Sequence, residues 1–554
     1  MKLKTKPTGW RRICIACIVL LTVFIQPLCA QQKLPLIKAT SKIVDIKDGD
    51  LYQKAIWNLS PEIKPDVYYA LHPVLAKKII FYTDLDSISF DINPGSSYDF
   101  IILLNGKDSC YTRISTTTPA LKTETSKVSL NTMEPALLKQ DFTLFRNALQ
   151  QEHAGLYRYE SKAVLDNLFD SCQAALDRPM SQLAFAKSIM FMVSAIEDGH
   201  TGTNIPRLLM NQYGENEKMF PAYVFFINKK AYVLCSRIKE LSAGTEILSI
   251  ENKMVSEIRH ILLQYLPSDG KIETKKQQTL NNGAFPFLYN WIFGNKDSFA
   301  VKYKTKEGKI KSTNIHAEFL KDFECDNGND SNTTKDLQLD FLQENTALLT
   351  VKTFDDNRLS GKQDFRDFLN TSFKEINSRK ADKLTIDLRR NAGGTDAYGA
   401  LLYSYLTNKP FKYFSSIEST TAKITLKENP LLGFQQPQEN SFPGEVYFLI
   451  SGLSFSTTAD FCAIAKSNNR GKFIGEETGG GYYGNTSGTT TRIELTNSQI
   501  EIIIPKFKYV NDVKKSPYKD RGVNPDYIIT PTIDDVISHK DVQLNFAIKL
   551  AQGK

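Results

Sequence analysis

Long hydrophobic runs are scarce in this chain of 554 residues. The run ICIACIVLLTVFI, residues 13–25, is shorter than the roughly 20 apolar residues that span a bilayer. Five basic residues precede it and Cys29-Ala30 follows, which is the pattern of a secretory signal. The sequence therefore predicts a signal peptide at residues 1–30, cleavage after Ala30, no remaining membrane span, and a periplasmic or extracellular protein. The alternative is lipoprotein acylation at Cys29, although Gln26-Pro27-Leu28 lacks the small residue expected before such a cysteine.

Cysteine and histidine are also sparse. Beyond the signal the cysteines are odd in number and form no CxxC pair, which argues against a disulfide framework or a zinc site. The six histidines include no HExxH, so no metal-ligand set is visible. The segment GGGYYGNTSG lacks the spacing of a phosphate-binding P-loop. We predict neither a metal nor a cofactor. The five cysteines are Cys110, Cys172, Cys235, Cys325 and Cys462.

A strong surplus of one charge is missing as well. The formal charge is +8, and five of these charges lie in the signal, so the mature chain carries +3 with acidic and basic residues interspersed. This balance argues against a nucleic-acid partner. A glycosidase needs two facing carboxylates, and nothing in the sequence distinguishes such a pair.

The length indicates several domains, since one core rarely exceeds about 200 residues. Alternating segments at residues 31–116 predict an N-terminal all-β, sandwich-like domain, followed by a polar, Thr-rich linker at residues 117–135. Residues 136–205 show helical spacing, and Ser181 is a candidate helix cap. Residues 206–312 begin with the strand-like segments YVFFI and AYVLC. This region resembles a PDZ-like insert, and the alternative is a plain β-rich insert. Alternating strands and helices in residues 313–554 predict an α/β core.

Three short stretches each carry a reactive or anion-binding element at the end of a strand or helix. SGLSFSTTADF (451–461) places hydroxyls where a strand meets a helix N-terminus, which favours negative charge, but an N-cap serine explains it equally. The glycine pair in LRRNAGG (388–394) suits outward N–H groups of an oxyanion hole, or an ordinary turn. EDGHTGT (197–203) puts His200 in a turn after a helix, where histidine is often incidental.

Taken together, these stretches resemble the C-terminal-processing (tail-specific) serine peptidase family, in its tricorn-core-like branch. The resemblance rests on DGHT (198–201), DLRRNAGG (387–394), FSTTADF with IGEETGG (455–480) and RGVNPD (521–526), in the family's order. It implies a crotonase/ClpP-like α/β catalytic core.

The resemblance also assigns roles to residues. Ser456 becomes the nucleophile, with Ser454 as a weaker candidate, and His200 the general base and acid. The N–H of Thr457 and that of Gly393 or Gly394 would form the oxyanion hole.

Two positions depart from the family pattern. Gly481 stands where members with a Ser–Lys dyad carry lysine, which disfavours that mechanism. Lys519 stands where tricorn-like members carry a catalytic glutamate, and the neighbouring Asp520 is the candidate replacement.

The sequence thus predicts a secreted or periplasmic serine endopeptidase that hydrolyses peptide bonds of peptides or unfolded proteins through an acyl-enzyme. The alternative is a catalytically inactive peptide- or glycan-binding protein on a peptidase scaffold. If His200 is the base, activity should rise with pH through roughly 6–7.5, the range in which imidazole loses its proton. Cleavage preference, oligomeric state and the role of residues 31–116 stay open.

Overall fold

The computed structural model describes residues 132–206, 210, 217–323, 335–343 and 345–553, and before residue 132 the backbone of strands only. The chain divides into two compact units, residues 1–127 and 128–554. The predicted cleavage after Ala30, the alternative acylation of Cys29 and most of the predicted linker lie outside the described residues.

The described elements of the first unit are all strands, and they form two antiparallel sheets ordered β1-β2-β3-β6 and β5-β4-β7-β8. The strands are β1 (Leu21–Thr22), β2 (Lys38–Lys47), β3 (Asp50–Asn58), β4 (Val67–Leu71), β5 (Lys78–Phe81), β6 (Ser87–Ile92), β7 (Ser97–Leu104) and β8 (Asp108–Ser115).

The second unit opens with the helical segment, made of α1 (Pro135–Glu152), α2 (Lys162–Ala174) and α3 (Gln182–Ala195). Ser181 caps α3 as predicted, since its side chain accepts a hydrogen bond from the Ala184 N–H. The apolar faces of these helices pack together with Ile502 and Ile504 of β29 (Glu501–Asn511). Strand β11 (Gly202–Asn204) also pairs with β29. The helical segment is therefore tied to the C-terminal part of the chain, a contact between residues far apart in sequence.

An antiparallel sheet with order β13-β14-β15-β17-β18 follows, in which β16 also pairs with β15. Cys235, at the end of β14, is disulfide-bonded, which the argument against a disulfide framework did not predict. Cys172 and Cys462 are free thiols. The strands are β13 (Tyr223–Ile227), β14 (Lys230–Cys235), β15 (Glu246–Ile250), β16 (Lys253–Met254), β17 (Ser298–Lys304) and β18 (Ile310–His316), and the helices are α5 (Val255–Leu263), α6 (Glu273–Thr279) and α7 (Phe285–Phe293).

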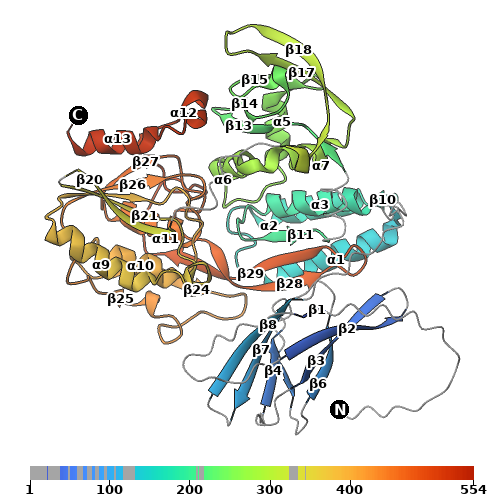
Figure 1. Ribbon diagram of the computed structural model, residues 1–554, viewed down its shortest axis with the longest axis horizontal. Coiled ribbons are helices and arrows are strands. Elements are labelled where there is room, and N and C mark those ends of the chain that lie inside the picture. Colours follow the sequence, from blue (N-terminus) through green and yellow to red (C-terminus); the bar gives the residue numbers. More distant parts are fainter. Residues whose placement is uncertain are drawn as a thin grey trace. The chain divides into compact units, whose positions relative to one another are not determined.

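The α/β core is a mixed sheet ordered β20-β21-β22-β26-β27-β30, in which only β20 is antiparallel to its neighbour. Helices α9, α10 and α11 contribute to the large apolar core on one face, and α13 packs on the other (Figure 1). The elements are β20 (Leu337–Gln343), β21 (Thr346–Val351), α8 (Asp356–Leu359), α9 (Phe365–Ser378), β22 (Lys383–Asp387), α10 (Asp396–Ser404), β26 (Glu445–Ile450), α11 (Thr457–Ser467), β27 (Lys472–Gly475), β30 (Tyr527–Ile528), α12 (Ile533–Ile537) and α13 (Val542–Ala551).

Shorter elements and one long hairpin connect these parts. Strands β28 and β29 form the hairpin, and β24 pairs with the far side of β29. The remaining strands are β9 (Thr132–Met133), β10 (Met180–Ser181), β12 (Lys218–Met219), β19 (Glu318–Phe319), β23 (Phe411–Lys412), β24 (Phe414–Glu418), β25 (Phe434–Gln435) and β28 (Thr486–Glu494).

In the part of the chain that the structure describes, no helix combines the length and apolar character that a membrane crossing needs.

Candidate active site

Ser456 lies at the corner between strand β26 and helix α11. Its backbone has φ 56° and ψ −132°, in the positive-φ region that costs non-glycine residues about 1–3 kcal/mol. Although Ser456 is the N-cap residue of α11, its side chain makes no capping hydrogen bond. The N-cap interpretation of this serine therefore does not explain its position, and the strained corner leaves its hydroxyl free for another partner.

That partner is His200, which comes from the turn between α3 and β11. The His200 Nε2 lies 3.0 Å from the Ser456 Oγ, which is hydrogen-bonding distance. The imidazole also stacks on Phe455, with ring centroids 4.5 Å apart and planes inclined by 29°. Two residues 256 positions apart in sequence thus form a nucleophile–base pair of the geometry that serine catalysis uses.

Ser454, the weaker candidate nucleophile, has a structural role instead. Its side chain is fully buried, and its Oγ donates to the Leu388 carbonyl at 2.8 Å and accepts from the Ser451 N–H at 3.1 Å. Its hydroxyl proton is therefore engaged within the loop.

The glycine pair approaches Ser456 closely. Gly393 has φ +101°, and a Cβ added there would lie 2.7 Å from the Ser456 Cβ, so only glycine fits. The Gly393 N–H donates to the Asn391 side chain at 2.9 Å. Among the described residues, the N–H groups of Gly394 and Thr457 have no acceptor. Of the two predicted glycines, Gly394 is thus the better oxyanion donor, together with Thr457, while Gly393 provides the close approach.

Two buried carboxylates, Asp198 and Asp269, lie near the His200 ring. One carboxylate oxygen of Asp198, one of Asp269 and one ring nitrogen of His200 all lie within 4.8 Å of one another. Asp198 Oδ1 accepts from the His200 and Thr201 N–H groups at 2.9 Å, which fixes the turn. Asp269 joins two loops, because it accepts from the Gly199 N–H at 2.8 Å and the Gly481 N–H at 3.1 Å.

The structure does not join Asp520 to His200. The Nδ1 of His200 is buried and has no hydrogen-bond partner among the described residues. The Asp520 segment presents backbone to this region, since its carbonyl accepts from the Lys271 N–H at 2.9 Å and lies against Gly270. The hypothesis that Asp520 replaces the missing glutamate is therefore not supported by this geometry, and Asp198 is the carboxylate whose charge acts on the imidazole.

The surroundings of His200 favour its neutral form. Burial lowers its pKa to about 4, the charge of Asp198 opposes this, and the charges of Lys275 and Arg158 reinforce it. Burial also opposes ionisation of Asp198, but the attraction of His153 and His200, together with hydrogen bonds to the carboxylate, lowers the Asp198 pKa. A neutral imidazole beside an ionised carboxylate is the resting state that a general base requires.

Asp198, His200 and Asp269 could together offer ligands to a cation. Their hydrogen bonds, however, suit a proton-transfer network better. Asp198 Oδ1 and both oxygens of Asp269 already accept backbone N–H groups. The Nε2 of His200 is directed at Ser456. The ammonium of Lys275, close enough to lower the pKa of His200, adds a repulsive charge.

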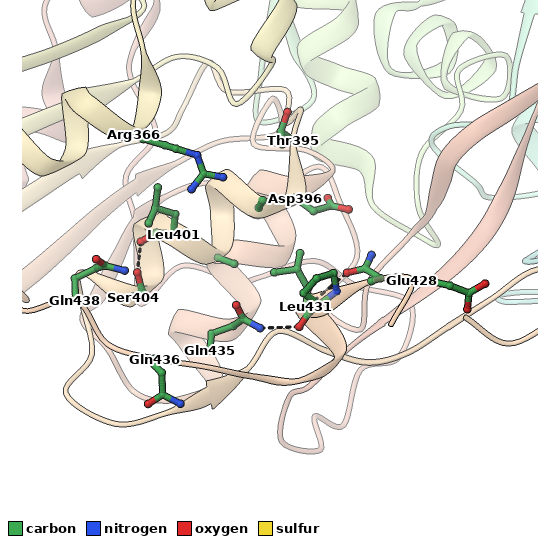
Figure 2. A pocket seen from close by; sticks show the side chains of 14 residues that line it. Arg366, Thr395, Asp396, Leu401, Ser404, Glu428, Leu431, Gln435, Gln436 and Gln438 are labelled. Atoms are coloured by element: carbon green, nitrogen blue, oxygen red, sulfur yellow. Dashed lines mark hydrogen bonds between the residues drawn. The ribbon is translucent and has the colours of Figure 1, made fainter. Parts of the chain in front are cut away.

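A cavity of about 630 Å³ adjoins the glycine turn (Figure 2). Thr395 and Asp396, which directly follow Gly394, line one side together with the rest of α10, and the segment 428–438 lines the other. Asp396 links the cavity to the nucleophile corner, because the Thr457 hydroxyl lies 2.7 Å from its Oδ1. The lining mixes apolar side chains, such as Leu401 and Leu431, with the amide side chains of Gln435, Gln436 and Gln438.

Sequence reasoning missed three residues of this site. Asp198 lies inside the DGHT motif itself, so the motif could have drawn attention to it. Asp269 and Lys275 lie in the segment before and within α6, about 70 residues from His200, and no local pattern there signals catalysis. Only the folded chain brings them to the site.

Comparisons with known proteins bear on the fold and the family of this chain. A search of curated proteins finds no match. The model of peptidase family S41 matches residues 345–529. Among solved structures, mature CPAF superposes with a TM-score of 0.54 at 13% identity, covering 75% of this chain and 96% of CPAF.

Further solved structures are also similar. Mature CPAF complexed with lactacystin gives a TM-score of 0.53 at 13% identity, covering 75% of this chain and 97% of that one. The photosystem II D1 C-terminal processing protease gives 0.36 at 14% identity, covering 71% and 92%. The CPAF likeness shows that the chain shares the multidomain mixed α/β fold of CPAF. Residues 345–529 of this chain thus match peptidase family S41, a family of serine-type peptidases.

Proposed function

We propose that the protein is a serine endopeptidase that cleaves peptides or unfolded proteins outside the cytoplasm, through an acyl-enzyme on Ser456. The single observation that carries the proposal is the 3.0 Å contact between the Ser456 Oγ and the His200 Nε2. The uncapped, strained position of Ser456 supports it, since a structural N-cap serine needs no such backbone. The signal-like N-terminal pattern supports export.

Each step of the proposed reaction has a residue. The Ser456 Oγ attacks the scissile carbonyl carbon while the neutral His200 Nε2 takes its proton. The carbonyl oxygen becomes an oxyanion, and the N–H groups of Thr457 and Gly394 donate hydrogen bonds to it. His200 then returns the proton to the leaving amine, and the C–N bond breaks. Water, deprotonated by His200, hydrolyses the Ser456 ester and releases the second product.

Asp198 would act on the charge that His200 acquires. Its Oδ1 accepts from the His200 N–H, and the whole side chain is buried, so little water screens its charge. On the far side, His153 Nε2 lies 2.7 Å from the Thr201 hydroxyl, which donates to Asp198 Oδ1 at 3.0 Å. This network fixes the carboxylate next to the imidazolium of the transition state.

The substrate would lie along the glycine turn, with one side chain in the cavity beside Asp396. An extended peptide whose carbonyl oxygen meets the N–H groups of Gly394 and Thr457 would lie near Thr395 and Asp396, which line the cavity. The PDZ-like assignment of residues 206–312 adds a second peptide-binding mode, in which a strand is added at the edge of the sheet next to β13 or β18.

The experiment that tests this function uses a denatured protein as substrate. The wild type should produce internal fragments, and Ser456→Ala should produce none. Ser454→Ala is the matched control, because it removes a hydroxyl two residues away from the same loop. The inactive binding protein, the alternative function, predicts that wild type and Ser456→Ala bind the denatured protein equally and that neither cleaves it.

A further inference from the structure

Lys275, in the first turn of α6, places its ammonium beside the turn that carries His200. The Lys275 Nζ donates to the Gly199 carbonyl at 2.8 Å. It also lies 3.6 Å from the centroid of the Phe455 ring, a short cation–π contact. Phe455 stacks on His200, so one lysine contacts both the residue before the proposed base and the ring on which that base rests.

Glycines on the neighbouring loops allow the close approach of α6. A Cβ added at Gly199 would lie 2.7 Å from Phe455 Cε2 and 2.8 Å from the Lys275 Nζ. Gly452 and Gly479 lie on the two loops that flank the nucleophile. A Cβ at Gly452 would lie 2.4 Å from the Thr274 backbone, and one at Gly479 would lie 3.1 Å from Lys275 Cβ. Three glycines thus let the first turn of α6 approach the loops that hold His200 and Ser456.

We infer that Lys275 is a positioning residue of the active site, which fixes the Gly199–His200 turn and the Phe455 ring so that the imidazole faces Ser456. The inference rests on the proposed function, because it assigns Lys275 a task in the Ser456–His200 reaction. It also gives the segment 206–312, which has no catalytic motif, a direct part in the peptidase site.

The charge of Lys275 also affects the pKa of His200. The groups that face it are Asp269, Asp198, Lys276 and His200. Burial lowers the pKa of Lys275 to about 8, against the attraction of the two aspartates, so it is mostly protonated at pH 7. Its charge lowers the pKa of His200 and partly offsets the burial that raises the Asp269 pKa to about 6. Lys275 therefore helps to keep the imidazole neutral.

Lys275 is not the proton acceptor itself. The atom in contact with the Ser456 hydroxyl is the His200 Nε2, whereas the Lys275 Nζ is engaged with the Gly199 carbonyl and the Phe455 ring. The position that carries lysine in members with a Ser–Lys dyad is Gly481 here. Lys275 enters from another segment and acts through His200.

The test measures the rate of labelling by a fluorophosphonate probe from pH 3 to 8 in the full-length protein. Lys275→Met should lower the plateau rate about tenfold or more, since small misplacements of a base are costly. It should also raise the midpoint of the acid limb by about one pH unit, because a like charge near His200 is removed. Lys276→Met is the matched control: it removes the same charge from the same helix, but its Nζ faces the Ser194 hydroxyl.

A merely structural role would lower the yield of folded protein without moving the acid midpoint of the folded fraction. An unchanged midpoint and rate in folded Lys275→Met would overturn the inference, as would an equal shift in Lys276→Met. Lys275→Gln, which keeps a polar head but no charge, replaces the methionine variant if that one does not fold. If the wild type is not labelled at all, the proposed function fails instead, so the two failures are distinguishable.

Discussion

The pH dependence of the wild-type protein gives the sharpest quantitative prediction. The sequence alone leads to an ordinary histidine that loses its proton near pH 6.5. The structure lowers the pKa of His200 to about 4, chiefly by burial. At pH 5 a base of pKa 4 is about 90% neutral, whereas one of pKa 6.5 is about 3% neutral. The two expectations therefore differ about thirtyfold in rate at pH 5.

The assay is the second-order rate of fluorophosphonate labelling, followed from pH 3.5 to 8. Labelling needs the nucleophile and its base but no bound peptide, so substrate titration does not enter. We expect a plateau that extends down to about pH 5. A midpoint between about pH 6 and 7 would refute the reasoning, because it would mean that His200 is well solvated or is not the base.

The same pKa shift affects stability, so folding must be checked at each pH. Because the folded-state pKa of His200 is depressed, the unfolded chain binds a proton between pH 6.5 and about 4 that the folded chain does not. Its contribution to stability is present above pH 6.5 and is lost as the pH falls through this window. Burial lowers the pKa of His153 as well, which acts in the same sense. Near-UV circular dichroism at each pH distinguishes a loss of labelling caused by unfolding from one caused by protonation of His200.

Three substitutions extend this account. His200→Ala should reduce cleavage of a denatured protein nearly as much as Ser456→Ala, by about 10⁴-fold or more, while the circular dichroism spectrum stays native; near-normal turnover would mean another base. Asp198→Asn should lower kcat by about 10²–10⁴-fold, whereas Asp520→Asn should change kcat by no more than a few-fold. If Asp520→Asn lowers kcat more than Asp198→Asn does, the sequence-based assignment of Asp520 is restored. Ala397→Trp, at the wall of the cavity, should raise KM for a peptide without slowing fluorophosphonate labelling, and equal losses in both would place the substrate elsewhere.

The sequence predicted the elements that local chemistry dictates. Ser456 and His200 each follow from a short motif, and the apolar spacing of the helices in residues 136–205 was sufficient to predict them. The motif order also indicated that distant segments meet, because one reaction needs all of them. Local pattern and tertiary contact agree at these positions.

Other features depend on contacts that leave no local trace. Asp269 and Lys275 reach the site from an insert whose own sequence indicates only strands and helices. The lowered pKa of His200 arises from burial by several segments. The choice between Gly393 and Gly394 depends on where the Asn391 side chain points, and the disulfide of Cys235 did not follow from an odd cysteine count.

The most direct measurement of the central claim is to map the fluorophosphonate adduct by mass spectrometry in the wild type and in His200→Ala. The account predicts a single adduct on Ser456, formed about 10³-fold or more slowly when His200 is absent. An adduct on Ser454, an adduct on Ser456 that forms equally fast without His200, or no adduct on folded wild-type protein would contradict it.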